Sequence, residues 1–144
     1  MSQLPRVANA ILDDRKITHY LLSTVHPTGA SKAKFFISFG FSPGNWAALK
    51  SALLNHPLNN PVTSQTSNPF GQKFEVSCSL VAPDGRNPCI ISVWIIEPLD
   101  PNPRFITASP NPRAGELIRH PIEKYASLDS AAAVLYMSEQ NMNG

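Results

Sequence analysis

The residues best suited to chemistry form one short segment that begins at His26 and continues through Pro-Thr-Gly-Ala-Ser to Lys32. A histidine can accept or donate a proton near neutral pH. Gly29 allows the loop to turn tightly, and Lys32 falls in the first turn of a predicted helix, whose free N–H groups attract anions. A histidine, a lysine and a helix N-terminus that converge would suit a phosphate group. The alternative interpretation, a loop histidine beside an exposed helical lysine, stays open.

Residues of the second half of the chain could complete such a site. Thr107 lies on a predicted strand, and its hydroxyl could donate a hydrogen bond to a phosphate. Trp94 lies on a predicted central strand. A tryptophan there belongs either to the core or, on the face away from the helices, to a surface that stacks a base. Lys34, Arg104 and Ser109 are further candidates for contacts with a substrate.

Motifs of other chemistries are missing from the sequence. There is no phosphate-binding loop, no dinucleotide-binding glycine pattern, no Cys/His cluster with zinc spacing and no serine in a nucleophile-elbow context. The four histidines are separate in sequence. We therefore expect neither a metal site nor a cofactor.

The elements that must position these residues change type midway along the chain. Apolar residues recur at helical spacing over three segments, 13–23, 31–39 and 42–56. Beyond residue 60 the pattern is typical of strands, over 62–66, 73–80, 89–96 and 104–109. Segregated helices and strands predict an α+β fold, with two to three N-terminal helices packed on a four-stranded antiparallel meander sheet. We expect residues 1–110 to form this single domain and residues 111–144 to form a tail that is partly helical or flexible.

Composition limits the classes of protein that remain. The chain has 144 residues, and its 14 prolines fall mostly at the predicted ends of helices and strands. Charged residues make up 15% and the formal net charge is +2, although residues 1–59 carry six basic and two acidic side chains. A disordered polyelectrolyte, a coiled coil and a strongly basic nucleic-acid binder are excluded. No apolar run is long enough to span a membrane, and the N-terminus shows no signal pattern, so we expect a cytoplasmic protein.

The two cysteines, Cys78 and Cys89, lie on the arms of a hairpin predicted around Pro83-Asp84-Gly85. Depending on the turn, the thiols point to opposite faces or sit diagonally at about 7–8 Å. Because neither arrangement favours a disulfide, we expect two free, half-buried thiols.

Several short segments resemble a family of small bacterial proteins known only as a domain of unknown function. In the family's order they are Ile17-Thr-His-Tyr-Leu-Leu, His26-Pro-x-Gly-x-x-Lys32-Ala-Lys-Phe-Phe, Gly40-Phe, Trp46, Pro69-Phe-Gly, Pro83-Asp-Gly-Arg, Val93-Trp-Ile-Ile-Glu-Pro and Phe105-Ile-Thr-Ala-x-Pro. The resemblance covers residues 11–110. The family's layout, helices followed by a four-stranded meander, is similar to that of the barnase/EndoU/colicin/RelE-like ribonucleases, many of which are toxins.

This resemblance also implies roles for individual residues. Members of the ribonuclease group often use a histidine or lysine from the helical part and a threonine or serine from a late strand. The matching positions here are His26, Lys32 and Thr107. The chain departs from the pattern two residues after Thr107, where Ser109 stands in place of an expected aromatic residue.

Two hypotheses follow. In the first, the protein is a metal-independent endoribonuclease of toxin type: His26 takes the proton of a ribose 2′-hydroxyl, while Lys32 and Thr107 stabilise charge on the phosphate. Its partners would be RNA and a cognate antitoxin or immunity protein. In the second, the protein is a non-catalytic interaction module, either a homodimer or one partner of a toxin–antitoxin pair. The low charge, the apolar central strand and the predicted helical tail favour the second hypothesis.

Overall fold

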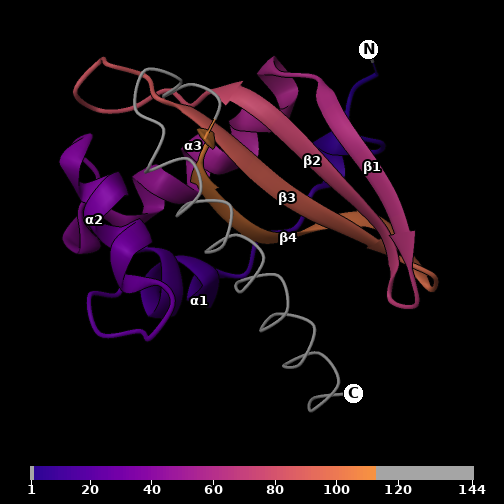
Figure 1. Ribbon diagram of the computed structural model, residues 1–144, viewed down its shortest axis with the longest axis horizontal. Coiled ribbons are helices and arrows are strands. Elements are labelled where there is room, and N and C mark those ends of the chain that lie inside the picture. The colour runs from indigo at the N-terminus through magenta and orange to yellow at the C-terminus, as the bar shows by residue number, and fades with distance from the viewer. Residues whose placement is uncertain (1, 113–144) are drawn as a thin grey trace.

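The computed structural model describes residues 2–112 and has the predicted α+β layout, with helices first and then one antiparallel sheet (Figure 1). The helical elements in chain order are η1 (Val7–Asn9), α1 (Asp14–Lys16), η2 (Ile17–Leu21), α2 (Ala30–Ser38), η3 (Pro43–Asn45) and α3 (Trp46–Asn59). The strands are β1 (Val62–Asn68), β2 (Gly71–Ser79), β3 (Cys89–Glu97) and β4 (Asp100–Pro110). The predicted tail, 111–144, lies outside the described residues apart from its first two.

The strands form the predicted meander in the order β1-β2-β3-β4, with every neighbouring pair antiparallel. In Figure 1, α3 passes behind the sheet, while α1 and α2 lie together beyond one end of it. The main apolar core joins Leu49 and Leu53 of α3 to Trp94 and Phe105 of the sheet. We call this face of the sheet the inner face, and the opposite face the outer face.

A β-bulge in β4 decides which face receives Thr107. Trp94 pairs with Phe105 and Val93 pairs with Thr107, so Ile106 is an extra residue in β4. Strict alternation would place Phe105 and Thr107 on the same face. Because of the bulge, Phe105 packs on the inner face, 5.3 Å from the ring of Trp94, whereas Thr107 shares the outer face with Val93.

The first predicted helix is divided in the structure. It begins at α1, where the Asp13 carboxylate accepts a hydrogen bond from the backbone N–H of Arg15 at 2.8 Å. It then widens into the π-helix η2, in which Ile17 and Leu21 are fully buried. Short π-helical turns often occur at functional sites. This one carries Tyr20, whose hydroxyl reaches β4.

Helix α2 is held at its C-terminal end by the loop that joins β2 to β3. The guanidinium of Arg86 donates to the carbonyl of Ser38 and lies 4.4 Å from the ring centroid of Phe39. The backbone N–H of Asp84 donates to the Phe39 carbonyl at 3.3 Å. Gly40 has a φ of +103°, the left-handed conformation in which a glycine commonly ends a helix.

Helix α3 extends further than the sequence predicts. The predicted helix ends at residue 56, but Pro57 lies inside the last turn and the helix continues to Asn59. The fixed φ of proline fits a helix, and its missing N–H removes only one hydrogen bond to the turn before it.

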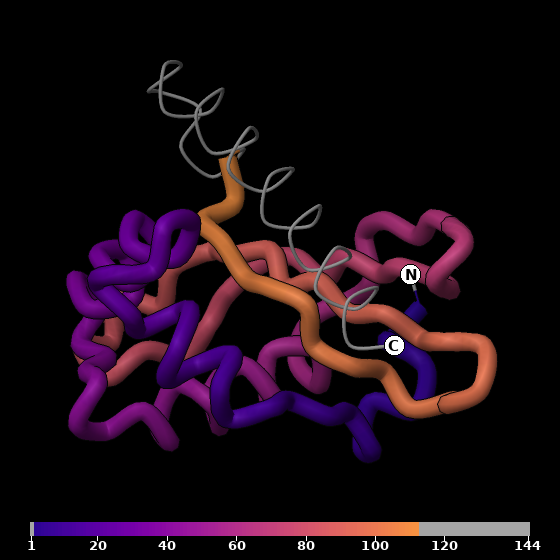
Figure 2. The backbone as a smooth tube through the Cα atoms, turned by 90° about the horizontal axis from the view of Figure 1, so that it is seen from below, coloured from indigo at the N-terminus to yellow at the C-terminus, as the bar shows by residue number. Residues whose placement is uncertain are grey.

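The free edge of β4 is partly covered by the N-terminal segment. The backbone N–H of Ile11 donates to the Pro103 carbonyl, and the N–H of Phe105 donates to the Ile11 carbonyl, both at 2.8 Å. Figure 2 shows this segment running beside the first part of β4. Prolines within β4 are tolerated because it is an edge strand. The last part of β4 is left next to α2, which contacts it.

The two cysteines are free thiols, as predicted, but only Cys89 has the expected partial burial. Cys78 has a φ of +135°, outside the ordinary strand region. Both are free; Cys78 is exposed and Cys89 is partly buried. Burial, followed by the contact with Cys78, raises the pKa of the Cys89 thiol.

Candidate functional site

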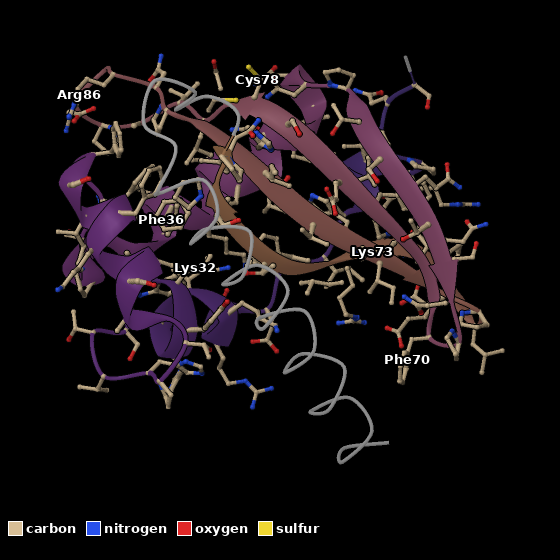
Figure 3. All side chains as sticks on the ribbon, in the orientation of Figure 1. Lys32, Phe36, Phe70, Lys73, Cys78 and Arg86 are labelled. Atoms are coloured by element: carbon tan, nitrogen blue, oxygen red, sulfur yellow. The ribbon has the colours of Figure 1, made fainter. Side chains whose placement is uncertain are left out.

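Three side chains from distant parts of the chain meet at the junction of the helices and β4. The ammonium Nζ of Lys32, on α2, donates to Oγ1 of Thr107 at 3.0 Å. The hydroxyl of Tyr20, on η2, lies 3.0 Å from the same Oγ1. Lys32 is 2% exposed and Thr107 1% exposed. Figure 3 shows Lys32 at this junction. We call Tyr20, Lys32 and Thr107 the outer cluster.

The chemical groups of the outer cluster decide which of them donates and which accepts each hydrogen bond. Because an ammonium group can only donate, Thr107 must accept the hydrogen bond from Lys32. Its own proton is therefore available to Tyr20 or to a substrate oxygen. The ring of Tyr20 lies 5.7 Å from Nζ of Lys32 and 5.9 Å from Nζ of Lys16. Both ammonium groups are therefore within cation–π distance of the same phenol ring.

His26 lies beside the cluster and packs the edge of its ring against Tyr20, with ring centroids 5.0 Å apart. Its Nδ1 accepts hydrogen bonds from the backbone N–H groups of Thr28 at 3.1 Å and Gly29 at 3.0 Å. The neutral ring therefore carries its proton on Nε2. In this tautomer Nε2 can donate a hydrogen bond but has no lone pair with which to accept a proton. The general-base role predicted from the sequence does not fit this arrangement.

Gly29 is needed for a reason that the sequence does not show. Its φ is an ordinary −88°, so it does not serve a strained turn. A Cβ atom at Gly29 would lie 2.3 Å from the carbonyl oxygen of Tyr20 and 2.8 Å from its Cδ1. The start of α2 and the backbone of η2 approach so closely that only glycine fits, and this contact fixes the position of Tyr20.

A pocket of about 300 Å³ adjoins the cluster, between α2 and the end of β4. It is lined by Ser31, Lys32, Lys34, Phe35, Ser38, Ser109 and Pro110. Ser109 pairs with Ile91 on the outer face, as Thr107 pairs with Val93. Its Oγ is buried without a hydrogen-bond partner, and the residue is 2% exposed. A buried hydroxyl without a partner calls for an explanation.

The predicted site residues therefore separate into two sets. Lys32 and Thr107 are hydrogen-bonded to each other, and the ring of His26 packs against the ring of Tyr20. Lys34 and Ser109 line the adjoining pocket. Two predicted substrate contacts, Trp94 and Arg104, lie elsewhere. Tyr20 was missed as a site residue, because at helical spacing with Ile17 and Leu21 it resembles one more member of an apolar stripe.

Trp94 and Arg104 are not brought to the cluster. The side chain of Trp94 is fully buried on the inner face, and its Nε1 donates to Oγ of Ser92 at 2.9 Å. It has no free face on which a base could stack, so the predicted substrate contact is wrong and the core interpretation is confirmed. Arg104 forms ion pairs with Glu97 at 3.3 Å and Asp100 at 3.7 Å, near the β3–β4 turn.

A second polar network was not predicted. His56 of α3 is 1% exposed; its Nε2 lies 2.8 Å from the carbonyl oxygen of Cys78, and its Nδ1 lies 2.8 Å from Oγ of Ser92. Since a carbonyl only accepts, Nε2 carries the proton, and Ser92 donates to Nδ1 while accepting from Trp94. Desolvation by burial lowers the pKa of His56. We call His56, Ser92 and Trp94 the inner network.

Over residues 2–112, no three His, Cys, Asp or Glu side chains are grouped so that they could hold a metal ion. Within the same residues, no helix has the length and apolar character needed to cross a membrane.

Fold and site together define a small α+β domain with a buried lysine–threonine pair beside a pocket. The chain belongs to the family of the domain of unknown function DUF6883, whose model matches residues 3–112. No match is found among curated proteins. Among solved structures, the chain is similar to a contact-dependent growth inhibition toxin–immunity protein complex from Klebsiella pneumoniae 342, at 18% identity and a TM-score of 0.57. The match covers 73% of this chain and 96% of that chain, and it indicates a shared fold.

Proposed function

We propose that this protein is a metal-independent endoribonuclease of toxin type whose centre is the outer cluster. The observation that carries the proposal is the 3.0 Å hydrogen bond between Lys32 and Thr107. It brings an ammonium group and a strand hydroxyl together beside a pocket, where charge on a phosphate could be stabilised. The similarity of the fold to a toxin–immunity complex supports a toxin-like role. Cleavage of cellular RNA would take place in the cytoplasm.

The reaction is an internal transesterification. The ribose 2′-oxygen attacks the neighbouring phosphorus and forms a new P–O bond, while the bond from phosphorus to the 5′-oxygen of the next nucleotide breaks. The 2′-hydroxyl loses a proton and the departing 5′-oxygen gains one. The products are a 2′,3′-cyclic phosphate and a 5′-hydroxyl. Lys32 and Thr107 donate to the phosphate oxygens as negative charge develops on them.

We assign to Tyr20, instead of His26, the donation of a proton to the departing 5′-oxygen; solvent water takes the proton of the 2′-hydroxyl and afterwards returns a proton to Tyr20. The hydroxyl of Tyr20 is bonded to Thr107, within reach of any phosphate held by the cluster. His26 has its Nδ1 occupied by two backbone N–H groups, so we assign it a positioning role. It holds the start of α2 and supports the ring of Tyr20.

The first test compares two lysines of equal charge. Lys32→Met should lower the rate of cleavage of a labelled single-stranded RNA by roughly 10²- to 10³-fold, as loss of a charge-stabilising donor does. Lys50→Met, which changes a half-exposed lysine paired with Asp14 on another helix, should cleave like the wild type. Equal cleavage by both variants, with circular dichroism showing both folded, would remove Lys32 from the mechanism.

The second test separates the roles of Tyr20 and His26. Tyr20→Phe keeps the ring and removes the hydroxyl, so cleavage should fall by roughly 10²- to 10⁴-fold. His26→Asn keeps an acceptor for the two backbone N–H groups and removes Nε2, so it should retain most of the activity, whereas His26→Ala should lose activity and thermal stability together. A His26→Asn variant as inactive as Tyr20→Phe would restore proton transfer to His26.

A second candidate function is that of a protein-interaction module. The observation in its favour is that the similar solved structure is a complex of a toxin with an immunity protein. The partner would be a cognate antitoxin or immunity protein, or a second copy of this chain in a homodimer. Size-exclusion chromatography with light scattering tests the homodimer, and a monomer with measurable ribonuclease activity would favour the first candidate.

A further inference from the structure

The pocket beside the outer cluster has walls of two kinds. One wall is a face of α2, where Ser31, Lys34, Phe35 and Ser38 recur at helical spacing. The other wall is the end of β4, with Ser109 and Pro110. Lys32 lines the pocket and also binds Thr107, so pocket and cluster are continuous.

The unpartnered hydroxyl of Ser109 indicates that the pocket accepts a polar group. Oγ of Ser109 is buried and has no hydrogen-bond partner, and Ser109 is one of the residues that line the pocket. Leaving such a group unpaired costs free energy that a ligand atom can recover. Ser38, on the opposite wall, donates its proton to the Phe35 carbonyl at 2.6 Å and keeps lone pairs for another donor.

The chemistry of the walls limits the kind of ligand. The lining residues contain two lysines and no carboxylate, so the pocket favours a neutral or anionic ligand over a cation. Phe35 and Pro110 supply apolar surface, and an aromatic ring can stack on any nucleobase. A volume of about 300 Å³ suits one nucleoside.

The spacing along β4 connects this ligand to the outer cluster. Ser109 and Thr107 are two residues apart on the outer face, which separates them by about 7 Å along a strand. This is close to the length of one nucleotide in an extended RNA strand. A strand whose phosphate lies at Lys32 and Thr107 would thus place a neighbouring nucleoside at Ser109.

We propose that the pocket is a nucleoside subsite for a single-stranded RNA, in which the base lies against Phe35 and Pro110 and a polar atom of the nucleoside binds Ser109. Lys34, which is exposed and lines the pocket, contacts the next phosphate of the RNA strand. The inference rests on the proposed ribonuclease function, because that function places a phosphate of the RNA at Lys32 and Thr107 and so sets the direction in which the RNA runs. Binding itself does not require that cleavage occur.

Binding is measured with a probe that cannot be cleaved. A fluorescently labelled hexanucleotide of mixed sequence, with every 2′-hydroxyl methylated, lacks the attacking group, and fluorescence anisotropy with the full chain gives its Kd. Phe35→Leu should weaken binding roughly tenfold through loss of stacking. Ser109→Ala should weaken it roughly three- to tenfold through loss of one hydrogen bond. Phe35→Tyr keeps an aromatic ring and should bind like the wild type.

Ser67→Ala is the matched control, because Ser67 is an exposed serine on β1. Weaker binding by Phe35→Leu and Ser109→Ala, with Phe35→Tyr and Ser67→Ala unchanged, supports the subsite whether or not the wild type cleaves RNA. If both pocket variants bind like the wild type, or if the wild type does not bind the probe, the proposal is overturned. The pocket would then be left to a protein partner. RNA cleavage, assayed separately, decides the proposed function.

Discussion

The two faces of the sheet carry polar networks that look alike and differ in one respect. On the inner face, Ser92 bridges a histidine and a tryptophan; on the outer face, Thr107 bridges a lysine and a tyrosine. The two hydroxyls lie on neighbouring strands, since Ser92 pairs with Ala108, next to Thr107. Both are almost fully buried.

The inner network and the outer cluster differ in the groups that surround their polar atoms. Every polar atom of the inner network has a partner within the protein, with the Cys78 carbonyl closing the chain. Such a closed network orders a core and leaves nothing for a ligand. The outer cluster instead contains a cation and borders a pocket with the unpaired hydroxyl of Ser109. Similar hydrogen bonding therefore serves structure on one face and, in our proposal, function on the other.

Of the two bridging hydroxyls, Thr107 is expected to show the larger effect when it is removed. Thr107→Val keeps the shape of the side chain and removes the hydroxyl that joins Lys32 and Tyr20, so RNA cleavage should fall by roughly 10²-fold. Because the buried ammonium of Lys32 loses this acceptor, the variant should also lose about 1–3 kcal/mol of unfolding free energy. Cleavage rates and denaturant titrations measure the two quantities. A variant that unfolds easily but cleaves normally when folded would make the outer cluster structural as well.

The next effect is expected where η2 and α2 touch. Gly29→Ala would bring a Cβ to 2.3 Å from the Tyr20 carbonyl oxygen, so the backbone must shift. We expect unfolding free energy to fall by about 1–3 kcal/mol, with a loss of cleavage as Tyr20 moves. Gly44→Ala is the control, because a Cβ at Gly44 has nothing within 4 Å. Similar stabilities for the two alanine variants would show that the close approach is not needed.

At the inner network the expected effect is on stability alone. Ser92→Ala leaves Nε1 of Trp94 and Nδ1 of His56 buried without partners, which should cost about 1–3 kcal/mol of unfolding free energy. Cleavage per folded molecule should be unchanged, the reverse of the result for Thr107→Val. Reduced cleavage at full folding would show that the two networks are coupled through the sheet.

The smallest effect is a dependence of stability on pH. Burial lowers the pKa of His56 in the folded protein below its ordinary value of 6.5, so the unfolded chain binds a proton more readily. The stabilising effect of the neutral ring is fully present above about pH 6.5 and is lost as the pH falls below it, with a slope of at most about 1.4 kcal/mol per pH unit. Melting temperatures from pH 8 to pH 5 should fall more steeply for the wild type than for His56→Gln. Parallel curves for the two proteins would contradict a buried neutral His56.

Much of the fold could be predicted from the sequence, because its signals are local. The helical spacing of Trp46, Leu49 and Leu53 and the alternation around Phe74 and Val76 each report one buried face. The candidate site was only partly predictable. Lys32 and Thr107 were chosen by chemical type and resemblance, but their contact joins positions 75 residues apart.

The sequence by itself determined the order and type of the elements, the candidate residues Lys32 and Thr107, and the basic character of the N-terminal part. Tertiary structure alone decided the rest. The bulge at Ile106 moved Thr107 to the outer face, and backbone contacts fixed the tautomer of His26. Packing of α2 on β4 created the pocket that Ser109 lines. These features depend on contacts between distant segments, which only the packing of the whole domain brings together, whereas a helix or strand pattern depends on residues close in sequence.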